Sequence, residues 1–413
     1  MHESEVDEAK DIDMTANKEN SKHTVTLAEL FFTFLKIGST AFGGFMALIS
    51  VVQDLAVERK KWLSHQEMLD GISLATILPG PVAVNVVAYV GFKIRGKMGA
   101  AVAATAVTLP SFILIVSLSA VYFAWGQVPV ISSFFMGLIP AVLAIIIVTA
   151  WRMALQATIG PASLIIMLVS IVALLSIGGF FITLSVVIGS GIVGVIIYGP
   201  ALRKIIRRHP DVSGGNPAKS TGNSTLAVNP LPVAAFFVFT PVLITKLFLV
   251  FAGMSLMLFG GGYVFIPLIQ QVVVSEYGWV TQKEFIDSIA MGQVTPGPIL
   301  ISAAFIGYKV AGIMGALSAT IGIFLPPVAL MLVATHGLEK IKSSEWVAAA
   351  LKGIRPAVVG MIFAASIVVA QTATGQWPTA LIFIATIVLI LQLRLQVAWL
   401  IPMSGLLGIL LYQ

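Results

Sequence analysis

Two Pro-Gly-Pro triplets interrupt apolar segments of this chain and restrict its fold more than any other feature. The segments are 73–94 and 288–310, and the triplets are Pro79, Gly80 and Pro81, and Pro296, Gly297 and Pro298. A proline removes a helix hydrogen bond and clashes with the preceding turn, so two prolines within three residues end a helix. We therefore predict that each segment consists of two short helices that meet at the triplet.

The composition is that of a membrane protein. Of the 413 residues, 58% are hydrophobic and only 10% are charged, which is far from the balance of soluble domains. The apolar runs are long and separated by short loops, which favours helices, because barrel strands alternate weakly over about 10 residues. We predict an all-α polytopic protein that crosses the cell (plasma) membrane several times, with the lipid bilayer as a partner.

The charged and titratable residues exclude several classes of function. The net charge is +6, and the basic residues lie in short loops beside apolar runs, which indicates cytoplasmic anchoring and argues against nucleic-acid binding. Cysteine is absent and the five histidines are scattered, so neither a metal site nor a nucleophile triad is expected. We predict that the chain is not an enzyme and uses no metal or cofactor.

The chain divides into two homologous halves joined by a polar linker. Residues 1–24 form a polar, acidic tail that is expected to be disordered, and residues 201–231 are basic and rich in Ser, Gly, Asn and Pro, as is typical of linkers. The two domains are therefore expected at 25–200 and 232–413. Adding 217 to an early position, or 216 after a one-residue slip that follows the triplet, gives the equivalent position in the second half.

Identical residues recur at this offset. The matched sets are Phe42, Gly43 and Gly44 with Phe259, Gly260 and Gly261; Trp62 with Trp279; Glu67 and Asp70 with Glu284 and Asp287; the two triplets; Gly91, Lys93, Gly96, Gly99 and Pro110 with Gly307, Lys309, Gly312, Gly315 and Pro326; and Gly137 and Pro140 with Gly353 and Pro356. Chance would not keep this register, so the halves are internal repeats.

The loop charges predict how each half crosses the membrane. A crossing helix has ~20 residues, and the apolar runs of half one that reach this length lie at about 26–50, 97–124, 131–151, 160–178 and 180–199. The positive-inside rule places the basic loops on both sides of the first triplet segment in the cytoplasm. That segment is therefore a re-entrant helical hairpin. With about five crossings in each half, an odd number, the second half is inverted relative to the first, as in many secondary transporters.

The triplets predict an anion site. A helix that begins after Pro81 or Pro298 directs unbonded N–H groups and about half a positive charge toward the bilayer centre. Both Phe-Gly-Gly segments belong to this candidate site, because glycines let helices approach closely. The polar side chains near the triplets that could donate to an anion are Thr76, Asn85, Gln293, Thr295 and Ser302. In the alternative interpretation, the prolines only shape a kink and the polar side chains only join helices.

Charged residues in apolar surroundings complete the candidate site. Intramembrane cations are costly and usually functional, so Lys93, Lys309 and Arg355 are candidates for substrate binding, although such side chains also snorkel to the membrane surface. Asp70 and Asp287 occupy equivalent positions before the two triplets and are candidates for coupling by protonation. The alternative for these carboxylates is a structural role, as caps or ion-pair partners near the interface.

These motifs resemble those of the chromate ion transporter family in its long, two-domain form. The resembling elements are FGGF at 42–45, FGGGYVFIP at 259–267, ERKKW at 58–62, WVTQKEF at 279–285, both triplets, and the Gly-(Phe/Tyr)-Lys and Met-Gly-Ala sequences that follow each triplet. The resemblance implies a secondary active transporter that exports chromate from the cytoplasm by alternating access and confers chromate resistance. Phe45 and Thr76 depart from the proline and the glutamine that many family members carry.

Several alternatives stay open. Sulfate or another inorganic anion could replace chromate, because the departures from the family fall near the predicted site. An anion channel needs a continuous polar lining, whereas the polar residues here gather near two tips, and a scaffold needs no matched helix breaks. The sequence leaves undetermined the transport direction, the coupling ion and its stoichiometry, and the oligomeric state, for which a homodimer is a candidate.

Overall fold

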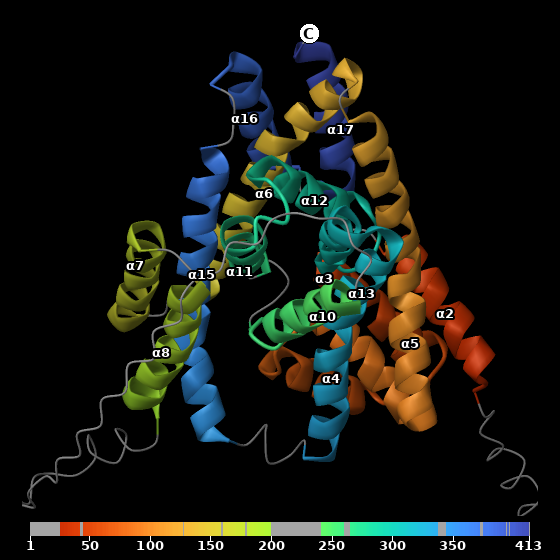
Figure 1. Ribbon diagram of the computed structural model, residues 1–413. Coiled ribbons are helices and arrows are strands. Elements are labelled where there is room, and N and C mark those ends of the chain that lie inside the picture. The colour runs from red at the N-terminus through yellow and green to blue at the C-terminus, as the bar shows by residue number, and fades with distance from the viewer. Residues whose placement is uncertain are drawn as a thin grey trace, which may run out of the picture.

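The computed structural model is helical, with no strand among the residues that it describes (Figure 1). Those residues are 25–41, 44–126, 128–157, 160–177, 180–199, 241–259, 265–337, 344–371, 375–393, 395 and 397–412. The predicted tail at 1–24 and linker at 201–231 lie outside them. So do four of the Phe-Gly-Gly residues, namely Phe42, Gly43, Gly260 and Gly261.

The elements recur in the same order in the two halves. The first half contains α2 (Leu27–Thr40), α3 (Gly44–Gln53), the π-helix η1 (Asp54–Arg59), α4 (His65–Ile77), α5 (Val82–Trp125), α6 (Pro129–Ala157), α7 (Pro161–Ser176) and α8 (Phe180–Tyr198). The second half contains α10 (Pro241–Ser255), α11 (Phe265–Gln270), the π-helix η3 (Gln271–Glu276), α12 (Gln282–Val294), the 3₁₀ helix η4 (Ile299–Ile301), α13 (Ser302–His336), α15 (Glu345–Ala370), α16 (Trp377–Leu391) and α17 (Val397–Leu411).

Many of these helices have the composition of membrane helices. Among the described residues, four are long and apolar enough to cross a bilayer: Val82–Trp125, Pro129–Leu155, Ile299–His336 and Glu345–Ala370. Shorter apolar helices lie at Pro161–Ser176, Ile182–Tyr198, Val242–Ser255, Trp377–Leu391 and Trp399–Leu411. An all-helical fold with such apolar helices is that of a membrane protein.

Helix α5 turns back on itself near its start. Its 44 residues would extend about 66 Å if the helix were straight. Gly96, however, has φ +61° and leaves the helical conformation together with Arg95. A Cβ added to Gly91 would collide with the backbone of Gly99, so the chain before the turn packs closely against the chain after it. The glycines therefore make a tight reversal that larger residues would prevent.

Helix α13 repeats this reversal at the equivalent place. Gly312 has φ +59°, and the backbones of Gly307 and Gly315 meet as closely as those of their counterparts in α5. Each half therefore has a short helix after its triplet and then a separate long helix.

The predicted single crossing at 26–50 is wrong. α2 ends before Ala41, whose backbone is not helical (φ −81°, ψ 81°), and α3 begins only at Gly44. Lys60 Nζ lies 2.9 Å from Glu29 Oε1, so the chain returns from this break to the level at which α2 begins. Half one therefore loses one of its predicted crossings, and the odd number of crossings no longer supports an inverted second half.

The second half contains the equivalent contact. Lys246 Nζ lies 4.3 Å from the centre of the Tyr277 ring. Lys246 and Tyr277 stand 217 residues after Glu29 and Lys60. The equivalent positions are therefore in contact in both halves, through an ion pair in the first half and a cation–π contact in the second.

The helices on the two sides of each triplet lie antiparallel. Glu67 Oε1 and Lys93 Nζ are 3.7 Å apart across the first triplet, and Glu284 Oε1 and Lys309 Nζ are 2.9 Å apart across the second. The partners of each pair stand almost equally far before and after their triplet, so the ion pair joins the open ends of a hairpin. We call residues 65–94 the first triplet hairpin and residues 282–310 the second.

Local sequence explains where the first arm of each triplet hairpin begins and ends. Ser64 caps α4 and Thr281 caps α12 by accepting from the backbone N–H of a glutamate three residues later, and each glutamate side chain accepts in return from the N–H of the capping residue. This reciprocal arrangement satisfies donors that a helix N-terminus leaves free. The prolines of the triplets then stop both arms after 13 residues.

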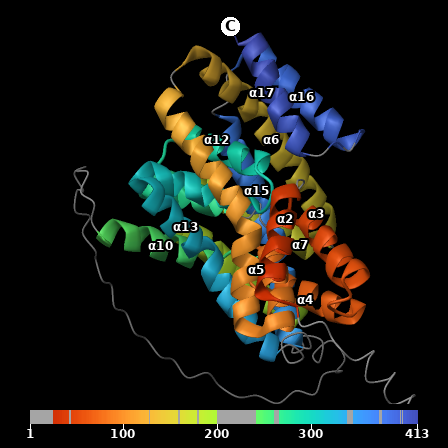
Figure 2. The ribbon, with the colours of Figure 1, turned by 90° about the vertical axis from the view of Figure 1, so that its right-hand side faces the viewer.

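The equivalent long helices α6 and α15 run in opposite directions. In Figure 1, α6 descends from the top, where it follows α5, and α15 ascends from the bottom, where it follows α13. Both views place α16 and α17 at the top and α4 at the bottom (Figures 1 and 2). Helices α7 and α8 pack against α15, and α16 and α17 pack against α6. The last two helices of each half thus cover the long helix of the other half.

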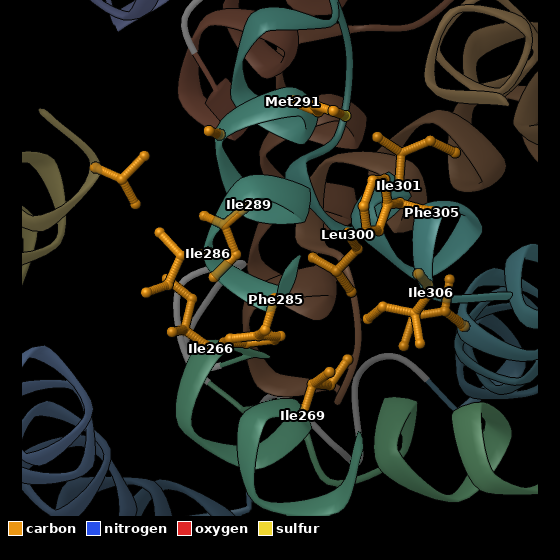
Figure 3. Close-up of a cluster of buried hydrophobic side chains, with 14 of the residues drawn as sticks. Ile266, Ile269, Phe285, Ile286, Ile289, Met291, Leu300, Ile301, Phe305 and Ile306 are labelled. Atoms are coloured by element: carbon orange, nitrogen blue, oxygen red, sulfur yellow. The ribbon is translucent and has the colours of Figure 1, made fainter. Parts of the chain in front are cut away.

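The largest buried apolar cluster surrounds the second triplet hairpin (Figure 3). Phe285 and Ile289 of α12 are fully buried, as are Ile266 of α11 and Phe305 of α13. Leu300 in η4, two residues after Pro298, is also buried. Protein therefore encloses this hairpin, which is the condition under which an interrupted helix is tolerated at membrane depth.

Candidate anion-binding site

Each triplet is bonded to the opposite half of the protein. The backbone N–H of Gly80 donates to the carbonyl oxygen of Leu258 at 2.7 Å, and that of Gly297 donates to the carbonyl oxygen of Ala41 at 3.0 Å. Ala41 and Leu258 are equivalent positions, and each directly precedes a Phe-Gly-Gly segment. The two triplets therefore lie at the boundary between the halves and are related by the repeat.

Close packing at both triplets requires glycine. Gly80 has φ +101° and Gly297 has φ +103°, a region that residues with a Cβ rarely adopt. A Cβ at Gly80 would collide with Pro327 of α13, and one at Gly297 would collide with the hydroxyl of Ser111 in α5. Ser111 and Pro327 are again equivalent positions, so each tip rests on the long helix of the other half.

The two tips differ in their polar contacts. The Ser111 hydroxyl donates to the carbonyl of Pro296, which fixes the second tip to α5. No hydroxyl is available at Pro327, and the first tip is held instead from within its own hairpin. There the buried Asn85 Nδ2 donates to the Pro79 carbonyl at 3.2 Å.

Backbone donors at the tips come from helices that begin at the triplets. α5 begins at Val82, directly after Pro81, and η4 begins at Ile299, directly after Pro298 and before α13. The first N–H groups of a helix have no intrahelical acceptor and carry its positive dipole end. The helices therefore begin at the triplets, with a 3₁₀ turn in place of the first α-turn in the second half, and the binding of an anion there stays a prediction.

The Gln293 side chain lies close to the second triplet in the sequence, and its amide is free to bind a ligand. Only 9% of it is exposed, and neither its Nε2 nor its Oε1 has a hydrogen-bond partner among the described residues. Thr295, by contrast, donates to the Gly292 carbonyl at 3.0 Å, and Ser302 donates to the Ile299 carbonyl at 3.0 Å. A buried amide without partners is unfavourable unless something else binds it.

The predicted cations lie away from the triplets. Lys93 and Lys309 pair with Glu67 and Glu284 at the open ends of the hairpins. They stand 12 or 13 residues from the glycine of their triplet, which corresponds to roughly 18–20 Å of helix. Arg355 is exposed on α15 and has no ion-pair partner among the described residues. The structure therefore does not bring these three side chains together with the triplets.

The two equivalent aspartates have different environments. Asp287 is fully buried, and its Oδ2 accepts from the Tyr122 hydroxyl at 2.7 Å. Asp70 is half-buried on α4, and its Oδ1 accepts from Gln66 Nε2 at 3.0 Å. The repeat alone gave no reason to distinguish them, because Tyr122, the partner of Asp287, comes from a helix that lies far away in the sequence.

The remaining candidates stand beside the triplet contacts. Phe259 is half-buried and follows Leu258, the acceptor for Gly80, while Gly44 begins α3 three residues after Ala41. Thr76 donates to the Ser73 carbonyl at 2.7 Å, within its own helix. Sequence reasoning missed Ser111 and Tyr122, and the one available signal was that Ser111 follows Pro110, a proline conserved between the halves.

Comparison with known proteins agrees with this architecture. A sequence model of the chromate transporter family matches residues 28–195 and 245–409. The chain belongs to the chromate transporter family. Its matched parts are the two halves, and the unmatched residues between them contain the predicted linker.

Relatives in this family match over nearly their whole length. A chromate transport protein of Cupriavidus metallidurans is 28% identical over 392 residues, or 94% of each chain. A probable chromate transport protein of Synechococcus elongatus is 29% identical, covering 86% of this chain and 88% of that one. An uncharacterized transporter of Methanocaldococcus jannaschii is 30% identical, covering 91% and 92%. No solved structure matches the chain.

Proposed function

We propose that this protein is a secondary active transporter that exports chromate, or a related oxyanion, from the cytoplasm and thereby confers chromate resistance. The observation that carries the proposal is the reciprocal bonding of the triplets, Gly80 to Leu258 and Gly297 to Ala41. It sets two helix N-termini at the boundary between the halves, and helix N-termini bind anions through their N–H groups and dipoles. The family and its named chromate transport proteins support chromate as the substrate.

The halves form inverted repeats in this proposal. Its support is the opposite direction of the equivalent helices α6 and α15 (Figure 1), rather than a count of crossings. In secondary transporters of this build, the halves rock against each other around a site formed by broken helices. Because each triplet rests on the other half, relative motion of the halves opens the site to alternate sides of the membrane.

The triplet hairpins are re-entrant in this arrangement. The basic loops beside Lys60 and Lys97 lie on the cytoplasmic face, and the Glu29–Lys60 ion pair brings the start of α2 to the same face. The first triplet hairpin then enters and leaves from the cytoplasm. The second triplet hairpin, in the inverted half, enters from the outside.

The donors predict which anions bind. Backbone N–H groups and the Gln293 amide recognise oxygen atoms with negative charge and exclude cations. Chromate and sulfate are both tetrahedral dianions of similar size, so these donors accept either. We therefore expect sulfate to compete with chromate, and the ratio of their affinities decides which one is the physiological substrate.

Transport into membrane vesicles tests the function and its direction. Inside-out vesicles that contain the protein should accumulate labelled chromate when a membrane potential or a pH gradient is imposed, and vesicles without the protein should not. Unlabelled sulfate should reduce this uptake, whereas cations should not. Uptake only by right-side-out vesicles would reverse the proposed direction, and uptake of neither anion in either orientation would refute the proposed function.

A further inference from the structure

We propose that Asp287 and Tyr122 form a proton-binding site that couples movement of the second triplet hairpin to the pH of the adjoining solution. This inference rests on the proposed transport function and names its coupling site. The sequence offered Asp70 and Asp287 as equal candidates. The structure separates them by burial: Asp287 is completely buried, has a hydroxyl partner on another element and lies beside a polar cavity, whereas Asp70 is half-buried.

The carboxyl group of Asp287 has fewer hydrogen bonds among the described residues than a buried carboxylate needs. Its side chain is 0% exposed, Oδ2 accepts from the Tyr122 hydroxyl at 2.7 Å, and Oδ1 has no hydrogen-bond partner among the described residues. A buried carboxylate with one donor is poorly compensated for its lost hydration. Addition of a proton at Oδ1 removes the charge, and Tyr122 keeps its own proton, so one hydronium ion supplies the whole step.

A polar cavity of ≈ 320 Å³ gives this pair a route to water. Tyr122 lines it together with Thr281, Lys283, Glu284 and Lys309, which are residues at the open end of the second triplet hairpin. The volume is large enough for several water molecules. Tyr122 also packs against Phe135 and Phe305, with ring centres 4.8 and 5.3 Å away. A second cavity that Tyr122 lines has apolar walls, so the polar cavity is the route to water in this proposal.

The surrounding charges leave Asp287 without an ion pair. Helix α12 packs against α5, α6, α11, α13, η4 and α17. The titratable groups near Asp287 from these elements and from α12 itself are Tyr122, Lys309, Lys283 and Glu284, and Lys309 is already paired with Glu284 at 2.9 Å. The other titratable groups on these elements are Arg152 of α6, which donates to the Ile390 carbonyl, and Tyr89, Lys93, Arg95 and Lys97 of α5 and Tyr308 and His336 of α13.

The position of the pair links protonation to the candidate site. Hydrogen bonds join the second triplet hairpin to α5 at the tip, from the Ser111 hydroxyl to the Pro296 carbonyl, and on the arm, from the Tyr122 hydroxyl to Asp287. Lys309 Nζ also lies 4.8 Å from the centre of the Phe123 ring in α5. A hydrogen bond to a carboxylate is roughly twice as strong as one between neutral groups. Protonation of Asp287 therefore weakens the arm contact while the tip contact remains, and the hairpin can pivot on Ser111.

The sequence of the second half does not repeat the two α5 hydroxyl groups. Pro327 and Leu338 stand where Ser111 and Tyr122 stand in the repeat, and Asp70 accepts from Gln66 within its own helix. The Tyr122–Asp287 bond is therefore not duplicated by the repeat, and we assign coupling to Asp287 rather than to a symmetric pair of carboxyl groups.

Proton flux in liposomes is the first test. The purified full-length chain is reconstituted with a pH-sensitive dye inside, and a chromate gradient is imposed. In the wild type, chromate transport should be accompanied by a proton flux across the membrane. For one coupled proton, a pH difference of one unit between the two sides should change the ratio of chromate concentrations that is reached about tenfold. Asp287→Asn should carry chromate down its own gradient without proton flux. Retained proton flux in Asp287→Asn would overturn the proposal.

Asp70→Asn is the matched comparison. It replaces one carboxyl oxygen by a nitrogen, as Asp287→Asn does, and it keeps an oxygen that can accept from Gln66. This variant should therefore retain proton flux. Equal loss of flux in both variants would contradict the assignment to Asp287 alone. Wild-type chromate transport that is independent of pH would also refute the coupling site while leaving the transport function intact, whereas absence of anion transport would remove the transport function itself.

An infrared titration of the detergent-solubilised protein provides a readout that needs no transport. A carboxylic-acid C=O band should appear as the pH falls and should be absent from Asp287→Asn. Tyr122→Phe removes the donor that favours the charged form, so it should move the midpoint of this band to higher pH. An unchanged midpoint in Tyr122→Phe, or an unchanged band in Asp287→Asn, would show that the pair is only structural.

Discussion

The backbone N–H of Gly80 donates to the carbonyl of Leu258, 178 residues later in the chain, at 2.7 Å. The repeat-related bond, from Gly297 to Ala41, crosses the same boundary in the other direction at 3.0 Å. Each half therefore supplies the support on which the other half's triplet rests. A change at either triplet should disturb both halves, and this expectation shapes the predictions below.

Gly80→Ala and Gly297→Ala should each destabilise the protein and abolish transport. The new Cβ would collide with Pro327 or Ser111, and positive φ adds strain, so the free energy of unfolding should fall by more than about 1 kcal/mol. Thermal unfolding in detergent measures this. Gly253→Ala is the control, because nothing lies within 4 Å of a Cβ at that helical position, and it should unfold at or above the wild-type temperature.

Replacement of both prolines of one triplet by alanine should weaken anion binding. Pro79→Ala with Pro81→Ala lets the helix become continuous, which withdraws the N–H groups of the first turn of α5 into helical bonding. The dipole at one helix end contributes about 0.3–2 kcal/mol, and direct N–H bonds add to it, so chromate affinity should fall at least several-fold. Equilibrium binding of labelled chromate measures the change.

The double replacement at the second triplet, Pro296→Ala with Pro298→Ala, should have the same effect if both tips belong to one site. A folded double variant at either triplet with wild-type affinity would mean that the triplets are packing devices and that the anion binds elsewhere.

Gln293→Leu should weaken chromate binding without destabilising the fold. The side chain is buried and has no partner among the described residues, so its removal leaves no other group unpaired. A hydrogen bond to a charged ligand is worth about 1.5–3 kcal/mol, which corresponds to roughly a 10- to 100-fold loss of affinity. The exposed Gln392 provides the control, and Gln392→Leu should bind as the wild type does. Unchanged affinity in Gln293→Leu would remove this amide from the site.

Cysteine labelling should place residues 29, 60 and 97 on one face of the membrane. The chain has no cysteine, so Glu29→Cys, Lys60→Cys and Lys97→Cys can be labelled singly with an impermeant reagent in intact cells and inside-out vesicles. Val128→Cys, beyond the long segment of α5, should react from the opposite face. Labelling of residues 60 and 97 from opposite faces would exclude a re-entrant first triplet hairpin.

The sequence alone was enough to predict the membrane class and the helix breaks at the triplets. These features depend on local chemistry: a long apolar run requires a bilayer, and Pro-Gly-Pro ends a helix wherever it stands. The same local reasoning failed at 26–50. Hydropathy there suggested one crossing, because the sequence between α2 and α3 carries no charge that would mark a break, whereas the Glu29–Lys60 ion pair shows that the chain returns.

Which residues meet across the halves was decided only by the tertiary structure. Ser111 and Tyr122 looked like ordinary residues of a long apolar helix, and they acquire roles because that helix passes the second triplet hairpin at two points. Likewise, Asp70 and Asp287 are equivalent in sequence but differ in burial and partners. A repeat copies residue types and their spacing along the chain, whereas burial and hydrogen bonding depend on the neighbour that packing brings, and the two neighbours here are not the same residue.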